Sequence, residues 1–409
     1  MKRLLIVILI LLTGMIVYAQ GRDMSFFIED LRRPLATFHQ NLETLEAVRD
    51  ANLTEIGDFY HEALRYIITR LPNIRSIGDR EDVEASLTII ANGLAAEEYT
   101  DAAAELWSIV QFADTVQPHN DGLLMQTALI ALGQLGDLTY APHIALRLDN
   151  FNTDVISDVE TRRRVQRGVV GCVNALEALG SAVGYRPVFF ASNGWYDVAI
   201  RTIARNALPN ILDDPADIII EIIRDPSIVP AIKYEAFRIM LASVAPDESK
   251  ARVAATALNT GWIQLATDPN NQRIMREMRM VAIDTIRDMG AADDSIYVNL
   301  RRSYMNNYVS TAPDYDEIRR TISALGALAS DEAVDMLLEF LGELNTRRRL
   351  GPWTTTRERQ IFGWVLAAIG GTGTQSVPVR TLLTTISRSD EYTGVEQSWA
   401  RDAMNRLGF

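Results

Sequence analysis

The sequence predicts an all-α fold in which helical hairpins stack into a right-handed α–α superhelix, a helical-repeat solenoid. Three observations support this class. Apolar residues recur with helical periodicity, and Gly, Pro, Asn or Asp interrupts the pattern at short intervals. Strict alternation of apolar and polar residues is scarce, so strands are not expected. A short apolar string also recurs at a nearly constant spacing, which indicates repeated units that share one core.

The chain has 409 residues, of which 48% are hydrophobic and 23% are charged, as in ordinary globular proteins. This length is large for one compact domain and favours either several domains or an array of repeats. The apolar periodicity and its interruptions predict helices over residues 28–49, 54–71, 80–95, 98–116, 122–135, 140–149, 157–179, 195–211, 214–224, 228–244, 247–266, 271–289, 293–308, 314–328, 331–345, 356–369, 376–387 and 394–407.

The recurring string consists of a small or apolar residue, Leu, two variable residues, Leu, and then Gly or Ala. Its seven copies end at residues 136, 180, 245, 290, 329, 370 and 408; five of the six gaps are close to 40 residues and the other is 65. The two apolar columns are three residues apart and share one helix face, so we expect them in the core. A closing Gly suits a left-handed residue at a helix end, whereas we expect Ala245 and Ala329 to end their helices differently. The first column is Leu132, Leu176, Leu241, Ile286, Leu325, Leu366 and Met404, and the second is Leu135, Leu179, Val244, Met289, Leu328, Ile369 and Leu407.

Each copy is followed by a polar turn and a second apolar helix, as in GDLTYAPHIALRL at 136–148. This arrangement resembles HEAT repeats, above all the HEAT-like subtype that also occurs in bilin lyases, and residues 123–148 match it best. The resemblance covers Asp121 to the C-terminus, and the motif is weak between Gln20 and His119. We therefore expect a signal peptide at 1–19, a helical region of degenerate repeats at 20–119 and a HEAT-like array at 120–409. The resemblance implies an extended binding surface, while a shared fold does not transfer the lyase activity.

The N-terminus predicts export. Lys2 and Arg3 precede an apolar run from Leu4 to Val17, and small residues around Ala19 form a cleavage site. The run is short for a membrane-spanning helix, which needs about 20 residues, although an uncleaved anchor remains an alternative. We expect a bacterial protein that is periplasmic or secreted after cleavage behind Ala19, with no insertion in the membrane thereafter.

The charge balance excludes two classes of partner. The chain carries 40 basic and 53 acidic residues, a net charge of −13. Removal of residues 1–19 takes away two basic residues and no acidic ones, which leaves −15. A protein this acidic is not expected to bind nucleic acid or anionic lipid, because both need a basic surface.

No motif indicates catalysis, a metal or a cofactor. The four histidines, His39, His61, His119 and His143, lack the spacing of a helical zinc site, and we interpret them as surface or capping residues. Cys172 is the only cysteine and falls in a core column, which favours a buried thiol over a nucleophile. The acidic pairs 213–214 and 293–294 fall at predicted helix starts, where Asp caps backbone amides. The run 370–373 matches an inter-helix turn better than a phosphate loop.

Three stretches depart from the repeat period: 181–196, 301–316 and 346–359. Insertions in solenoids form loops on one edge and often carry contacts. The basic islands Arg162 to Arg164 with Arg167, and Arg347 to Arg349 with Arg357 and Arg359, either pair with acidic neighbouring helices or dock an acidic partner. The aromatic residues near them either form a binding surface or anchor the insertions internally. The candidate partner-binding residues are Phe189, Phe190, Trp195, Tyr196, Arg347, Arg348, Arg349 and Trp353.

The sequence thus predicts a non-catalytic exported scaffold of the bacterial envelope that binds a protein partner, with no cofactor. Two alternatives stay open: a periplasmic carbohydrate-active enzyme built as a closed α/α toroid, and a structural subunit of an envelope assembly. The sequence leaves the partner and the oligomeric state undefined.

Overall fold

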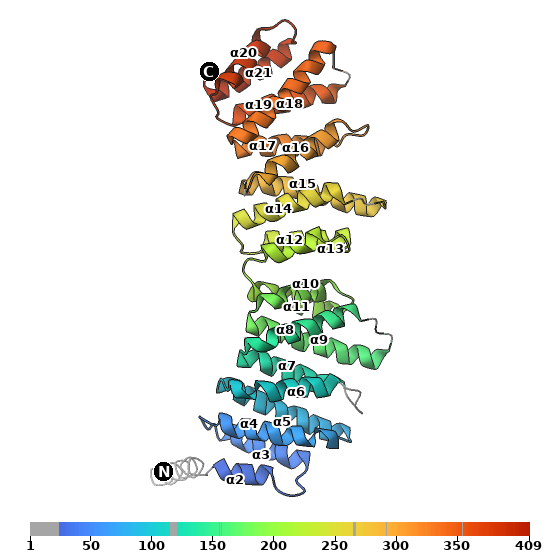
Figure 1. The fold of residues 1–409 in the computed structure, drawn as a ribbon, viewed down its shortest axis with the longest axis vertical. Helices are drawn as coiled ribbons and strands as arrows, with labels where there is room; N and C mark the ends of the chain where they lie inside the picture. Colours follow the sequence, from blue (N-terminus) through green and yellow to red (C-terminus); the bar gives the residue numbers. More distant parts are fainter. Residues whose placement is uncertain are drawn as a thin grey trace, which may run out of the picture. The chain divides into compact units, whose positions relative to one another are not determined.

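The computed structural model describes residues 24–114, 121–154, 156, 158–264, 267–291, 293–353 and 355–409. These residues form twenty α-helices, α2 to α21, and four short 3₁₀ helices, without a strand among them (Figure 1). The predicted all-α helical-repeat class is therefore confirmed. The predicted signal peptide and His119 lie outside the described residues. The chain divides into two compact units, Met1–Leu212 and Asp213–Phe409, which are described separately.

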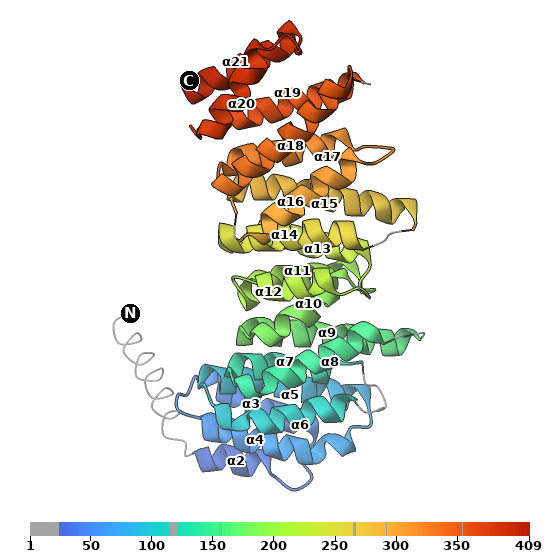
Figure 2. The ribbon, with the colours of Figure 1, turned by 45° about the horizontal axis from the view of Figure 1, so that its top comes forward.

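The first unit has two layers of helices. In one layer each odd-numbered helix packs on the next, from α3 through α5, α7 and α9 to α11. The even-numbered helices pair with them as hairpins and form the second layer, as Figures 1 and 2 show. The helices are α2 (Met24–Leu31), α3 (Phe38–Asp50), α4 (Gly57–Arg70), α5 (Ile77–Ala96), α6 (Ala103–Asp114), α7 (Leu123–Leu135), α8 (Ala141–Thr153), α9 (Val159–Leu179), α10 (Tyr185–Asn193) and α11 (Val198–Ile211), with the 3₁₀ helices η1 (Leu71–Asn73), η2 (Thr100–Ala102), η3 (Leu138–Tyr140) and η4 (Ala182–Gly184).

The second unit repeats this plan. The odd-numbered helices α13, α15, α17, α19 and α21 pack in succession, and α12, α14, α16 and α18 form the other layer. Because the helices alternate in direction, all turns from an even to an odd helix lie at one edge of the unit. The helices are α12 (Ala216–Arg224), α13 (Pro230–Ala242), α14 (Asp247–Ile263), α15 (Pro269–Met289), α16 (Ser295–Tyr308), α17 (Tyr315–Leu328), α18 (Asp331–Leu350), α19 (Thr356–Gly371), α20 (Val377–Arg388) and α21 (Gly394–Leu407).

The seven copies of the recurring string fall on odd-numbered helices, and most of their apolar columns are buried. The copy at 240–245 is out of register. Because α13 ends at Ala242, Met240 is the fully buried residue of its last turn, Leu241 is partly exposed and Val244 is 79% exposed. In all seven copies, by contrast, the residue four positions before the first column is buried, Cys172 among them.

Two predicted helix ends are wrong. The sequence predicts that Ala329 ends its helix differently from the glycines, yet Ala329 adopts φ 51° and ψ 21°, in the left-handed region that Gly136 and Gly180 also occupy. The turn therefore imposes a left-handed backbone on Ala329. The Cβ of a residue other than glycine destabilises this conformation by about 1–2 kcal/mol. Gly370 does not end its helix, because α19 continues to Gly371.

The stretch 181–196 is not an inserted loop, contrary to the prediction. It contains η4 and α10, a regular member of the even-numbered layer. The 65-residue gap holds one additional odd-numbered helix, α11, which lacks the closing glycine and contains Pro209. Its residues Ala204, Leu208 and Ile211 are still buried, so the gap contains a divergent repeat.

Candidate partner-binding site

The predicted arginine island 347–349 lies in the last turn of α18. The negative end of the helix dipole stabilises basic side chains at this position. Each arginine faces a carboxylate from a later helix or loop. Arg347 pairs with Glu358, the Nε atom of Arg348 lies 3.7 Å from Oε2 of Glu396, and the Nε atom of Arg349 lies 3.3 Å from Oε2 of Glu391. The sequence leaves open whether these arginines pair within the chain or dock an acidic partner, and in the structure they pair within the chain.

Glu396 anchors the segment that follows α18. It is fully buried at the start of α21, where its carboxylate and the Thr393 side chain form a reciprocal cap. The indole N–H of Trp353 donates to Oε1 at 2.8 Å, and Nε of Arg359 lies 3.3 Å from the same oxygen. Burial acts to raise the pKa of Glu396, but the hydrogen bonds from Thr393 and Trp353 and the nearby Arg348 outweigh it and hold the pKa below its ordinary value. Trp353 therefore binds the loop to the body of the unit.

A cavity of about 310 Å³ lies where two of the predicted irregular stretches meet. The end of α16 and the loop before α17 contribute one wall, from the stretch 301–316. Arg347 and Glu358, from the stretch 346–359, contribute another. We call this cavity the loop pocket; its lining consists of Tyr308, Val309, Ser310, Pro313, Tyr315, Ile318, Arg347, Glu358 and Ile361.

The wall of the loop pocket is held by the core. Tyr308 stacks on Tyr304 at a centroid distance of 5.5 Å, and Tyr304 stacks in turn on Phe340 at 3.6 Å. Burial raises the pKa of Tyr308, and the Glu358 carboxylate raises it further while Arg347 opposes the shift. Tyr308 is therefore neutral over the physiological range and can donate a hydrogen bond.

The rim of the loop pocket is accessible. Val309 is 71% exposed, and the Arg357 guanidinium lies 5.8 Å from the centroid of the Tyr315 ring. The pocket thus combines apolar and aromatic walls with a charged pair at one end. Such a site can hold an apolar side chain while the charged pair fixes the orientation of polar groups beside it.

The other predicted aromatic residues lie in the first unit and differ in accessibility. Phe189 is fully buried and Tyr196 is 3% exposed, where its hydroxyl donates to Oδ1 of Asn152 at 3.0 Å; both anchor α10 and the turn after it. Phe190 is partly buried beneath the Arg186 guanidinium. Trp195 is 39% exposed, and the guanidinium of Arg162, from the first basic island, lies 5.9 Å from its ring.

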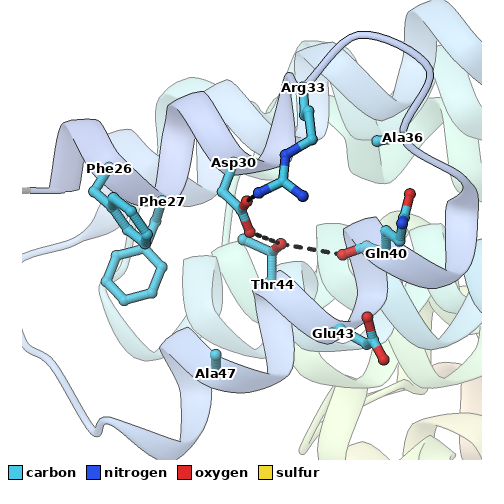
Figure 3. Close-up of a pocket in the computed structure, with 9 residues that line it drawn as sticks. All are labelled: Phe26, Phe27, Asp30, Arg33, Ala36, Gln40, Glu43, Thr44 and Ala47. Carbon is cyan, nitrogen blue, oxygen red and sulfur yellow. Dashed lines mark hydrogen bonds and ion pairs between the residues drawn. The ribbon is translucent and has the colours of Figure 1, made fainter.

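Sequence reasoning missed a second cavity, of about 290 Å³, between α2 and α3 (Figure 3). Phe26 and Phe27 lie at one end, and Asp30 accepts a hydrogen bond from the Thr44 hydroxyl at 2.9 Å and pairs with Arg33. These polar groups bond to one another, and Phe26, which is 48% exposed, provides accessible apolar surface. No repeated motif covers this hairpin, so only a pair of adjacent phenylalanines in the sequence could have indicated it.

The remaining candidates have structural roles. Cys172 is fully buried, and burial raises the pKa of its thiol to about 12. Asp214 and Asp293 accept backbone N–H groups at the starts of their helices, as predicted. In the part of the chain that the structure describes, no group of three or more His, Cys, Asp or Glu residues could hold a metal ion. Among the same residues, no helix has the length and apolar character needed to cross a bilayer.

Comparisons with known proteins add little. No family model and no curated protein matches the sequence. A solved structure described under "A conserved phosphorylation switch controls the interaction between cadherin and beta-catenin in vitro and in vivo" is 12% identical, with a TM-score of 0.35, over 96% of this chain and 97% of that chain. A likeness this weak indicates no function for this chain.

Proposed function

We propose that this protein is a non-catalytic helical-repeat scaffold that holds a protein partner through the loop pocket. The observation that supports it is a cavity with a rigid aromatic wall, formed where the turn from α16 to α17 meets the helix ends on either side of the turn from α18 to α19. In a two-layer array of hairpins, such segments lie on the same edge and are free to vary without disturbing the core.

The composition of the pocket favours a protein partner. Tyrosine and arginine are enriched in the centres of protein interfaces, and two tyrosines and one arginine line this cavity. Tyr308 is already held by its stacking on Tyr304, so its side chain loses little conformational entropy when a partner binds. A small entropy loss favours affinity. The exposed Val309 provides apolar surface at the entrance.

We further propose that the repeats are of the HEAT-like type and that the protein acts in the bacterial envelope after export. The motif copies on the odd-numbered helices support the first point, and the basic and apolar residues at 2–17 support the second. Fractionation of cells that express the natural gene, followed by N-terminal sequencing, tests export: a mature chain that begins at Gln20 in the envelope fraction is expected.

Two matched valine variants test the docking site. Val309→Asp places a charge at the pocket entrance, and Val244→Asp places the same charge at a valine of similar exposure, 79%, in the turn after α13. Partners crosslinked to each variant in envelope extracts are quantified by mass spectrometry. We expect V309D to lose a specific partner at least tenfold, while V244D retains it. Equal retention by both variants, with unchanged circular dichroism, would contradict the assignment of the pocket.

A further inference from the structure

A cluster of aromatic rings lies on the even-numbered layer of the first unit. Trp107 of α6, Tyr140 of η3 and His143 of α8 have ring centroids 5.6 to 6.3 Å apart. Trp107 and Tyr140 are partly exposed and His143 is exposed. Leu146 lies one turn beyond His143 on α8 and is 61% exposed. We call Trp107, Tyr140 and His143 the ring patch; it takes no part in the loop pocket, which belongs to the other unit.

Carboxylates outnumber guanidinium groups around the ring patch. Burial raises the pKa of Tyr140, and the negative charges of Asp137 and Glu105 raise it further. Together with Asp114, these make three carboxylates beside the rings, against Arg65 and Arg147 as the two arginines that pair with Glu105 and Asp114.

The chain itself shows which group the rings accept. The Arg147 guanidinium lies 5.7 Å from the centroid of the Trp107 ring, while its Nη1 is 2.9 Å from Oδ1 of Asp114. A ring face together with a carboxylate is the usual environment of a bound guanidinium, because the face of the ring and the carboxylate both carry negative charge. Tyr140 ends η3, whose N-cap is Asp137, so the neighbouring element again brings a ring and a carboxylate close together in the chain.

We propose that the ring patch is a docking site for a basic segment of a partner protein, in which an arginine side chain lies against Tyr140 and His143. Charge complementarity supports this occupant: the surface is acidic, and the aromatic rings select a guanidinium from other cations by stacking. The proposal stands apart from the proposed function, because the two sites lie in different units and respond to different substitutions.

Isothermal titration calorimetry of the purified protein with tetra-arginine amide tests the site. Tetra-citrulline amide, which keeps the shape of arginine without its charge, is the comparison. Asp137→Asn removes one charge from the patch, and Asp247→Asn removes one from the exposed start of α14 in the other unit. We expect D137N to weaken binding of tetra-arginine about threefold or more and D247N to leave it unchanged, because at 0.15 M salt charges act over about 8 Å.

The contribution of the rings is tested separately. His143→Ala, at an exposed position, should weaken binding of tetra-arginine about two- to fivefold, as expected for one exposed cation–π contact. Trp107→Phe keeps a ring and should bind within twofold of the wild type, while Val309→Asp in the loop pocket should bind as the wild type does. Equal effects of D137N and D247N, equal binding of tetra-citrulline, or no effect of H143A would each overturn the proposal.

Discussion

The buried pair of Arg279 and Glu317 gives a quantitative test of how neighbouring repeats are joined. Glu317 is fully buried at the start of α17 and accepts hydrogen bonds from Nε and Nη2 of Arg279, at 2.9 and 3.0 Å, and from the Ser303 hydroxyl at 2.7 Å. Arg279 of α15 also donates to the Gly261 carbonyl at 2.9 Å, and its guanidinium lies 4.0 Å from the centroid of the Trp262 ring. All polar groups of the pair thus have partners.

Glu317→Ala leaves the Arg279 charge, whose side chain is only 13% exposed, without its carboxylate. Loss of one partner of a buried ion pair destabilises a protein by about 3–5 kcal/mol, because the other charge stays buried and uncompensated. The matched control is Glu277→Ala. Glu277 pairs with Arg273 of the same helix at 2.6 Å, but both side chains are largely exposed, and an exposed pair of this kind contributes about 0.2–1 kcal/mol.

Urea unfolding followed by tryptophan fluorescence and circular dichroism measures these changes, and the transition of the second unit is the relevant one. We expect E317A to cost several times as much as E277A. In the double variant Arg279→Met with Glu317→Met, the cost should fall well below the sum of the two single changes, since an apolar pair leaves no charge behind. A cost of E317A below about 1 kcal/mol, or additive single changes, would refute the reasoning.

Three further predictions concern the first unit. Gly133→Ala places a Cβ 2.6 Å from the Cα atom of Ala175, where α7 and α9 pack closely, so thermal unfolding should show a loss of about 1–3 kcal/mol. Burial raises the pKa of Glu84 to about 7, so the native state holds a proton that the unfolded state releases near pH 4.5. The contribution of Glu84 to stability must therefore decrease as pH rises from about 4.5 to 7. Glu84→Gln should be more stable than the wild type at pH 8 but not at pH 4, and equal unfolding midpoints at pH 8 would count against this. Cys172 is buried with a raised thiol pKa, so it should react with a thiol reagent only after unfolding in urea, and rapid native labelling would contradict that.

The sequence predicts the layer of odd-numbered helices well because its signal is local. Two apolar columns three residues apart, followed by a helix stop, require only that each helix bury one face against the next. The same reasoning fails where that signal is absent. Helix α11 lies within the predicted helix 195–211, but it has no closing glycine and contains Pro209, so the string does not mark its repeat and α10 is taken for an insertion. In α13 the helix ends two residues earlier than the string suggests.

The candidate site was only partly predictable. The two stretches that depart from the repeat period stand out in the sequence, and the hairpin topology places the turns within them on one edge. Which side chains remain accessible depends on contacts from residues far along the chain, because the carboxylates of Glu391 and Glu396 pair with Arg349 and Arg348. The ring patch was missed because Trp107, Tyr140 and His143 come from three different elements, none of which is unusual on its own.

Arginine side chains join consecutive hairpins of the second unit by pairing with acids on the next hairpin. Arg276 pairs with Asp314, Arg279 with Glu317 and Arg301 with Glu339, and in each case the partner lies 38 residues later in the sequence. This spacing is one repeat, so the pairs join equivalent positions of consecutive hairpins: the first two link α15 to α17, and the third links α16 to α18. A planar guanidinium can bond both oxygens of a carboxylate across a helix interface, which an ammonium group cannot do as well. Opposite charges at the repeat spacing are therefore a sequence signal of stacked hairpins that complements the leucine columns.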